Sequence, residues 1–405
     1  MPAFPKIREV HIRNYKSIEQ AVVRLSDLTV LIGTNGSGKS NFVDALSFVR
    51  DCVADSVDLA IQRRGGFSGL LWRPASTSGS IGIRLVIDLP NEDVADYAIE
   101  LSGEQGRSTT VTEERCVVTR AGGQADCFSL KNGEFIEEIA GIRARIEPGR
   151  LALFAASAAS EYRNVYDFLM GIRSYGIIPE KLGEMQTVDP GLQLRPDGSN
   201  GASVLRRLND TDPDRFERVA ELLKSVVPGV TGIGTQLFGG RFESVRFEEE
   251  GPTPDSPMSF MAPSMSEGTL RVLGFLLAAY QPLAPSVMVI EEPEANIHPA
   301  AAEVVTSVLI DASRRSQILV TTHSPEVLDY DDLSDDVFRV VAKTEGRTAI
   351  APVSAASREV IRDHLYSPGE LLRINELGAD LVAAKELSDG MEVFGPPARR
   401  IGEAA

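Results

Sequence analysis

Residues 33–40 read Gly33-Thr34-Asn35-Gly36-Ser37-Gly38-Lys39-Ser40 and match the pattern G-x-x-x-x-G-K-[ST] at every fixed position. Glycines allow the backbone to turn tightly and to direct successive N–H groups at phosphate oxygens. In this pattern Lys39 reaches the β- and γ-phosphates, and the hydroxyl of Ser40 binds Mg²⁺. An apolar, β-rich run precedes the loop at residues 28–32, and apolar side chains recur at helical spacing over residues 41–49. The sequence therefore predicts a nucleoside triphosphate site in which a helix N-terminus faces the phosphates.

The composition is that of a globular chain with an excess of acid. Its 405 residues exceed a typical single domain, which favours two lobes. The 58 acidic and 41 basic side chains give a net charge of −17, which excludes a uniformly basic nucleic-acid binder but not a local basic face. The three cysteines, Cys52, Cys116 and Cys127, are scattered in the way that is typical of reduced thiols in a cytosolic chain.

No segment has the pattern of a signal peptide or a membrane span. Residues 1–16 alternate charged and apolar side chains as a strand does. The most apolar region, residues 272–290, is interrupted by Gln281, Pro282 and Pro285, which divide it into a helix and a strand. We therefore expect a cytoplasmic protein without membrane contact.

A second motif ends another apolar run. Residues 287–292 read Val-Met-Val-Ile-Glu-Glu, the Walker B pattern of a buried strand that delivers carboxylates to the metal of a phosphate loop. We assign Glu291 to the water shell of Mg²⁺ and Glu292 to positioning the attacking water. Both carboxylates reach one site only if the strand breaks at Glu292, and Pro293 favours that break. The alternative is that Glu291 and Glu292 only end a strand and have no role in catalysis. The phosphate loop elsewhere in the chain makes this alternative less favoured.

Two further motifs each have a structural alternative. After the apolar residues 318–320 comes Thr-Thr-His-Ser-Pro, in which His323 is either a sensor of the γ-phosphate or an ordinary histidine at a strand end. Before the apolar residues 270–280 comes Ser-Met-Ser-Glu-Gly-Thr. There, Ser266 and the Gly268 backbone either meet a γ-phosphate or belong to a simple helix cap.

In this order, the motifs resemble those of ABC-type ATPases of the RecF/SMC-like group, near the AAA-family ATPases related to OLD proteins. The segments that carry the resemblance are Asn-Tyr-Lys-Ser at 14–17, Ile-Gly-Thr-Asn-Gly-Ser-Gly-Lys-Ser-Asn at 32–41, Ser-Glu-Gly-Thr-Leu-Arg at 266–271 and Ile-Glu-Glu-Pro-Glu at 290–294. The resemblance is specific over residues 1–50 and 260–330. It implies an α/β fold, a P-loop NTPase with an ABC-type ATPase head, whose mixed central sheet is joined by an antiparallel β subdomain and an inserted helical lobe.

We expect four segments along the chain. Residues 1–89 and 231–355 form the two halves of the ATPase core, 90–230 the inserted lobe, and 356–405 C-terminal helices with a flexible tail. An antiparallel sheet is predicted from strand patterns at 81–89, 97–101, 108–120 and 126–130, and helices are predicted from patterns at 151–171 and 203–227. The glutamate- and proline-rich residues 247–263 predict a mobile acidic loop.

The resemblance implies a role for each matching position. It assigns ATP binding to Gly33, Asn35, Gly36, Ser37, Gly38, Lys39, Ser40, Asn41, Ser266 and Gly268. It assigns catalysis to Glu292, His323 and Lys39, and Mg²⁺ binding to Ser40 and Glu291. Residues 294–298 would be the D-loop that communicates across a dimer. Asn14 and Lys16 are further candidates for phosphate contact, and either Gln186 or Gln193 would be the Q-loop glutamine.

Two positions depart from the family pattern. Glu291 replaces the usual Walker B aspartate and is one methylene longer, which loosens the expected metal geometry. The run Met265-Ser266-Glu267-Gly268-Thr269 lacks the first glycine of Leu-Ser-Gly-Gly-Gln.

The resemblance also implies that two copies enclose two ATP molecules head to tail and that hydrolysis releases this homodimer. We expect a Mg²⁺-dependent ATPase in DNA repair or DNA-linked defence. An alternative is a regulatory ATPase of an anti-phage or toxin-type module that controls a separate effector protein. A third possibility, a nuclease of the OLD type, needs a Toprim domain with clustered acids. The only candidate cluster, residues 329–336, is better interpreted as a solvated loop, so we expect no Toprim domain.

Overall fold

The computed structural model describes residues 4–72, 78–104, 109–137, 146–147, 149–251, 258–295, 297–330 and 333–398. Two compact units divide the chain. Unit 1 comprises Met1–Ile172, Ser334–Tyr366 and Ile374–Ala405, and unit 2 comprises Arg173–Leu333 and Ser367–Arg373. The division into four segments that we expect from the sequence stays a prediction.

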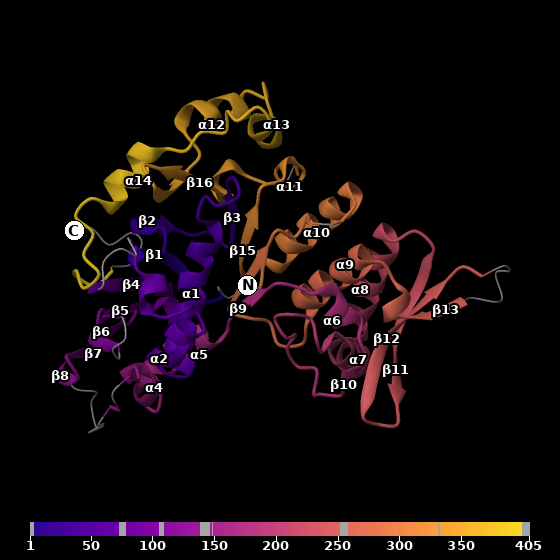
Figure 1. The fold of residues 1–405 in the computed structure, drawn as a ribbon, viewed down its shortest axis with the longest axis horizontal. Helices are drawn as coiled ribbons and strands as arrows, with labels where there is room; N and C mark the ends of the chain where they lie inside the picture. The colour runs from indigo at the N-terminus through magenta and orange to yellow at the C-terminus, as the bar shows by residue number, and fades with distance from the viewer. Residues whose placement is uncertain are drawn as a thin grey trace. The chain divides into compact units, whose positions relative to one another are not determined.

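An antiparallel sheet of seven strands dominates unit 1, in the order β2-β1-β4-β5-β6-β7-β8 (Figure 1). Its strands are β1 (Lys6–Tyr15), β2 (Ile18–Arg24), β4 (Ser78–Asp88), β5 (Val94–Glu104), β6 (Thr110–Thr119), β7 (Ala125–Lys131) and β8 (Glu134–Glu137). Four of them, β4 to β7, are the strands predicted for the antiparallel subdomain, which is confirmed. Ser108, which the prediction placed in the third of these strands, lies outside the described residues.

Unit 1 also contains the strand that leads into the phosphate loop. This strand is β3 (Leu28–Ile32), and it pairs in parallel with β16 (Phe338–Thr344), which pairs antiparallel with β17 (Arg347–Pro352). All five side chains of β3 are buried, as is typical of strands covered on both faces. The parallel and antiparallel pairings together make this a mixed sheet.

Helices cover unit 1. They are α1 (Lys39–Ala54), α2 (Val57–Gln62), α3 (Phe67–Leu70), α4 (Ala152–Ala156), α5 (Ser160–Met170), α12 (Ala355–Arg362) and α14 (Leu381–Ser388). Residues 90–92 and 335–337 form short 3₁₀ turns. Helix α1 packs against α2, α4 and α5, and Phe42, Leu46 and Val49 on its apolar face are buried (Figure 1). The helical pattern at 151–171 therefore corresponds to two helices, α4 and α5.

Unit 2 has a parallel strand pair that carries the second set of motifs. Strands β14 (Val287–Glu291) and β15 (Gln317–Thr322) pair in parallel. The helices are α6 (Pro179–Gly183), α7 (Gly201–Thr211), α8 (Pro213–Val226), α9 (Glu267–Tyr280), α10 (Pro299–Ala312), α11 (Pro325–Leu328) and α13 (Pro368–Arg373). Helix α9 packs against α6, α8 and α10 (Figure 1). The strand β9 (Ile172–Tyr175) starts at the boundary between the units.

A small antiparallel sheet completes unit 2. Its order is β10 (Gln186–Thr187), β12 (Phe242–Glu249) and β11 (Val230–Phe238), and β13 (Met258–Met261) pairs with β12. The acidic loop predicted over 247–263 is wrong at residues 247–249 and 258–261, because these residues belong to the paired strands β12 and β13. Residues 252–257 of the predicted loop lie outside the described residues. The helix predicted over 203–227 is two helices, because Asp212 caps a new helix that begins at Pro213.

Among the described residues, no helix is both long and apolar enough to cross a membrane.

Candidate functional site

The phosphate loop has the predicted order of strand, loop and helix. Strand β3 ends at Ile32, and α1 begins at Lys39 directly after Gly38. Gly36 and Gly38 have φ values of 76° and 113°, a region that residues with a Cβ rarely adopt. The N–H groups of Asn41 and Phe42 donate to the carbonyl of Gly38, both at 3.1 Å, so the helix starts directly at the end of the loop. The dipole of a helix N-terminus in this position favours an anion.

The Lys39 ammonium lies inside the loop. Its Nζ donates to the carbonyl oxygens of Gly33 at 2.7 Å and Thr34 at 3.2 Å, and the side chain is 5% exposed. Phosphate oxygens at this position can replace the two carbonyl acceptors. The Ser37 hydroxyl is buried and, among the described residues, lacks a hydrogen-bond partner, whereas Ser40 is exposed on the first turn of α1.

Asn14 and Lys16, the other candidates for phosphate contact, have partners within the protein. The Asn14 amide donates to the carbonyl of Ser80 at 3.1 Å, and Lys16 Nζ lies 2.5 Å from a carboxylate oxygen of Asp44. Burial alone would raise the pKa of Asp44, but hydrogen bonds from Lys16 and Tyr15 and the charge of Arg64 lower it. Asp44 therefore stays ionised and fixes Lys16 against α1, a partnership that no local sequence signal reveals.

In unit 2, the Walker B strand breaks where the sequence predicted. Strand β14 ends at Glu291, and Glu292 has a φ of 47°, a left-handed conformation that is uncommon for glutamate. The N–H of Glu292 donates to the carbonyl of Thr321 at 2.9 Å. Backbone strain of this kind is concentrated at functional sites, and here it turns Glu292 out of the strand alternation.

The structure brings Glu292 and His323 together and adds Glu294. The Nδ1 of His323 lies 3.4 Å from Glu292 and 3.9 Å from Glu294. The same oxygen of Glu294 accepts hydrogen bonds from the Thr322 hydroxyl at 2.5 Å and from the His323 N–H at 3.4 Å. Glu294 is 9% exposed, and its other oxygen, Oε2, has no partner among the described residues. A histidine between two carboxylates can hold or move a proton.

Sequence reasoning placed Glu294 only in the D-loop and did not connect it with His323. The sequence signal for this contact is the run Glu-Glu-Pro-Glu at 291–294, in which a third carboxylate follows the proline close to the strand end. Asn296, in the middle of the predicted D-loop, lies outside the described residues.

Ser266 caps α9, as its structural alternative predicted. Its hydroxyl accepts from the Thr269 N–H at 3.1 Å and lies 2.8 Å from the Thr269 hydroxyl. Ser266 is exposed and Gly268 is half-buried at this helix N-terminus. Capping does not occupy the remaining N–H groups of the first turn, so the role of Ser266 and Gly268 in binding a γ-phosphate stays a prediction.

The two Q-loop candidates have different surroundings. The amide of Gln186 is buried and fully used, since it donates to the carbonyls of Lys181 and Leu182 and accepts from the Ala202 N–H. Gln193 accepts from Arg173 at 3.2 Å and is half-buried. This geometry favours Gln193 over Gln186 as the residue able to turn toward a ligand.

The acidic run at 329–336 does not form a metal centre in the described part of the chain. Asp329 accepts from the Gly369 N–H at 2.8 Å and from Arg373 at 3.2 Å, and Asp335 pairs with Arg362 at 3.2 Å. Asp331 and Asp332 lie outside the described residues. Among the described residues, no group of three or more His, Cys, Asp or Glu side chains could hold a metal ion.

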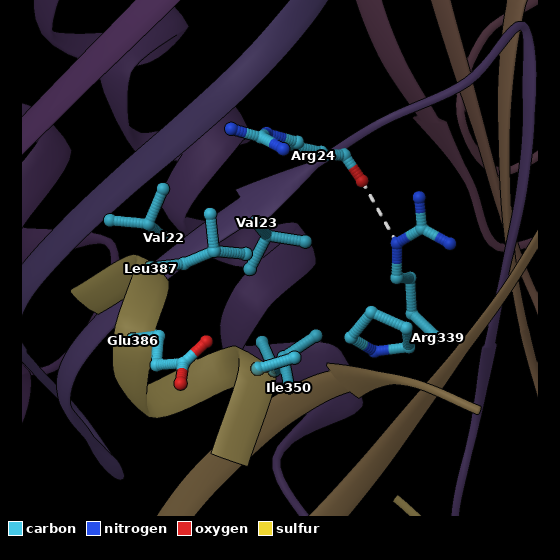
Figure 2. A pocket seen from close by; sticks show the side chains of 9 residues that line it. Val22, Val23, Arg24, Arg339, Ile350, Glu386 and Leu387 are labelled. Atoms are coloured by element: carbon cyan, nitrogen blue, oxygen red, sulfur yellow. Dashed lines mark hydrogen bonds between the residues drawn. The ribbon is translucent and has the colours of Figure 1, made fainter. Parts of the chain in front are cut away.

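A pocket of ≈ 400 Å³ opens on unit 1, and none of the predicted site residues lines it. Its lining is Val22, Val23, Arg24, Arg339, Ile350, Pro352, Ala383, Glu386 and Leu387. Figure 2 shows the Nε of Arg339 donating to the carbonyl of Arg24, at 2.9 Å. Burial lowers the pKa of Arg339.

Comparisons with known proteins match both sets of motifs. Residues 6–63, which contain the phosphate loop, match the family described as "AAA ATPase domain". Residues 234–329, which contain the Walker B and histidine motifs, match the family described as "AAA domain, putative AbiEii toxin, Type IV TA system".

Relatives and a solved structure agree with these matches. The DNA replication and repair protein RecF of Porphyromonas gingivalis is 38% identical over 86 residues, 20% of this chain and 24% of RecF. The chromosome partition protein Smc of Methanococcus voltae is 43% identical over 44 residues, 11% of this chain and 4% of Smc. The chain thus spans less than a quarter of the length of these relatives.

The fold is that of an SMC head. A crystal structure of an SMC head bound to the C-winged helix domain of ScpA has a TM-score of 0.52 to this chain, at 15% identity, and covers 87% of this chain and 99% of its own. Two segments of the chain thus match AAA ATPase families, shorter segments are similar to RecF and Smc, and the fold is that of an SMC head, as the resemblance to ABC-type ATPases of the RecF/SMC-like group predicts.

Proposed function

We propose that the chain binds ATP with Mg²⁺, hydrolyses it, and uses the cycle to switch between a monomer and an ATP-held homodimer in DNA repair or DNA-linked defence. The observation that carries the proposal is the buried Lys39 ammonium inside a glycine loop at the N-terminus of α1. The match of residues 6–63 to the AAA ATPase domain and the likeness to RecF support it. The same likeness supports a cytoplasmic location.

Each phosphate-binding residue of unit 1 has a distinct task in this proposal. Backbone N–H groups of residues 35–41 and the Lys39 ammonium hold the β- and γ-phosphates. Ser40 is the candidate Mg²⁺ ligand of unit 1, and Glu291 is the candidate ligand of unit 2, since hydroxyl and carboxylate oxygens are the hard ligands that this ion prefers. When bound, Mg²⁺ neutralises charge on the β- and γ-phosphate oxygens.

The residues of unit 2 act on water and on the γ-phosphate. Glu292 orients the attacking water and accepts its proton, and His323 donates a hydrogen bond to the γ-phosphate. Glu294 fixes the strand end that bears His323, because it accepts from Thr322 and from the His323 N–H. Ser266 and Gly268, at the N-terminus of α9, complete the site of the second copy.

Replacement of Lys39 by alanine tests the ATP site directly. We expect ATP affinity to fall at least about tenfold and hydrolysis to become undetectable, because the variant lacks the only loop cation that faces the phosphates. Calorimetry with ATP and a phosphate-release assay measure both effects. Lys224→Ala, on the exposed side of α8, is the matched control and should behave as wild type. ATP hydrolysis by Lys39→Ala at the wild-type rate would contradict the proposal.

A second candidate function is a regulatory ATPase that controls a separate effector protein in an anti-phage or toxin-type module. The match of residues 234–329 to a family described by a type IV toxin–antitoxin system favours it. The net charge of −17 suits a protein partner at least as well as bare DNA.

Two measurements separate these candidates. A protein that acts on DNA should bind duplex or single-stranded DNA with an affinity that falls steeply as salt increases. A regulatory ATPase should show no such binding and should instead co-purify from native cells with one stoichiometric protein, in an amount that depends on ATP.

A further inference from the structure

We propose that Thr348, on β17, is a positioning residue for the phosphate loop, an inference that rests on the proposed ATP site. The Thr348 hydroxyl donates to the carbonyl oxygen of Ser37 at 2.8 Å. The side chain is 3% exposed, and more than 300 positions separate it from the loop in the sequence. None of the motifs of the family resemblance includes it.

Thr348 is the middle of a directed chain of hydrogen bonds. The Asn41 amide donates to the Ser17 hydroxyl at 2.6 Å, and the Ser17 and Thr348 hydroxyl oxygens are 2.7 Å apart. Because Thr348 donates to Ser37, its oxygen is the acceptor for Ser17. Each hydroxyl therefore accepts once and donates once, and such chains strengthen their members cooperatively.

The strands around Thr348 approach the loop at two of its glycines. A Cβ on Gly38 would lie 2.1 Å from the Thr348 hydroxyl oxygen, and a Cβ on Gly33 would lie 2.3 Å from the carbonyl oxygen of Val341 on β16. The β16–β17 hairpin thus packs directly against the phosphate loop and supports it. Both glycines are needed for this contact as well as for their usual role near phosphate.

The hydrogen bond to Ser37 fixes the direction of a phosphate donor. In a trans peptide, the carbonyl of Ser37 and the N–H of Gly38 point in opposite directions. While Thr348 holds that carbonyl against the hairpin, the N–H of Gly38 must point away from the hairpin. Loss of the hydroxyl leaves this peptide free to rotate, and a rotated N–H no longer serves the phosphates.

Two substitutions at Thr348 separate its hydrogen bond from its packing. Thr348→Val keeps the shape and loses the hydroxyl, and we expect its Kd for ADP and for ATP to rise about tenfold. Thr348→Ser keeps the hydroxyl and should stay within about twofold of wild type. Calorimetric titration gives each Kd. Thr344→Val, at an exposed position of the same hairpin, is the matched control and should bind as wild type.

A third substitution covers the case in which Thr348→Val does not fold. Ser17→Ala removes the donor to Thr348 without changing β17, and we expect it to raise both Kd values by a smaller factor. Thermal unfolding of every variant shows whether the fold is retained.

The results distinguish a failure of the proposed ATP site from a failure of the role proposed for Thr348. Wild-type protein that binds no nucleotide would overturn the proposed ATP site and this inference with it. If the wild-type protein binds nucleotide and folded Thr348→Val binds it with equal affinity, the inference alone is overturned. If Thr348→Val does not fold, equal affinity of Ser17→Ala and wild type overturns the inference instead. Equal loss in Thr348→Ser and Thr348→Val would also overturn it, because the hydroxyl would then not be the cause.

Discussion

Exchange of Glu292 for glutamine is expected to slow ATP hydrolysis by about 10³-fold while ATP still binds. The glutamine amide has nearly the same shape and can keep a contact with His323, which lies 3.4 Å from Glu292. It cannot accept a proton from water. The phosphate loop and Lys39 remain intact, so ATP remains bound in the unreacted state.

The trapped state should also be visible as a dimer. Light scattering of Glu292→Gln with ATP and Mg²⁺ should show twice the mass measured without nucleotide, because hydrolysis no longer releases the proposed homodimer. Glu303→Gln, exposed on α10, is the matched control and should hydrolyse ATP as wild type does. Hydrolysis at the wild-type rate by Glu292→Gln would contradict its assignment, and slow hydrolysis without dimer formation would contradict the head-to-tail pairing.

The second large effect concerns a buried carboxyl outside the proposed site. Glu114, on β6, is 1% exposed and accepts from the N–H groups of Ala152 and Leu153 and from the Tyr97 hydroxyl. Burial raises the pKa of Glu114 to about 7, although these three donors act in the opposite direction. Glu114 joins the antiparallel sheet to the start of α4.

The sign of the pH dependence follows from this pKa. Below pH 4.5, Glu114 is protonated in both the folded and the unfolded chain. As the pH rises toward 7, the unfolded chain loses this proton first, so the free energy of unfolding falls. Above the folded pKa the loss is complete, at about 3 kcal/mol for a pKa raised from 4.5 to about 7.

Chemical denaturation at pH 5 and pH 8 measures this contribution. In Glu114→Gln, the difference between the two free energies of unfolding should be about 2.5 kcal/mol smaller than in wild type, because glutamine does not titrate and part of the loss has already occurred at pH 5. Glu113→Gln is the matched control, since its carboxylate lies on the same strand, 3.8 Å from Lys131, and is 21% exposed. An identical pH dependence in wild type and Glu114→Gln would contradict the raised pKa.

Much of the fold follows from local patterns that the sequence shows directly. The strand, loop and helix around Lys39 were predicted because each part depends on residues that are close together in the chain. The break at Glu292 was predicted for the same reason, since Pro293 follows it immediately. Division of the pattern at 203–227 into two helices was missed, although Asp212 and Pro213 form a recognisable cap.

The partners of the site residues depend instead on contacts between distant segments. Lys16 was a candidate for phosphate contact, but the structure pairs it with Asp44, 28 positions away in the chain, and Glu294 meets Thr322 at a similar separation. Hydropathy and spacing say which residues are buried or exposed, but not which polar side chains meet. That is decided when sheets and helices pack.

The sequence by itself determined the phosphate loop and predicted an ATPase head of the RecF/SMC-like group, because the loop at 33–40 and the motifs after 260 each depend on neighbouring residues. Only the tertiary structure decided what supports that loop. Thr348 and Ser17 reach Ser37 and Asn41 because β17 and the end of β1 lie beside the loop in the folded chain. Hydrogen bonds between segments 300 residues apart leave no periodic pattern in a sequence, since their geometry exists only after the chain has folded.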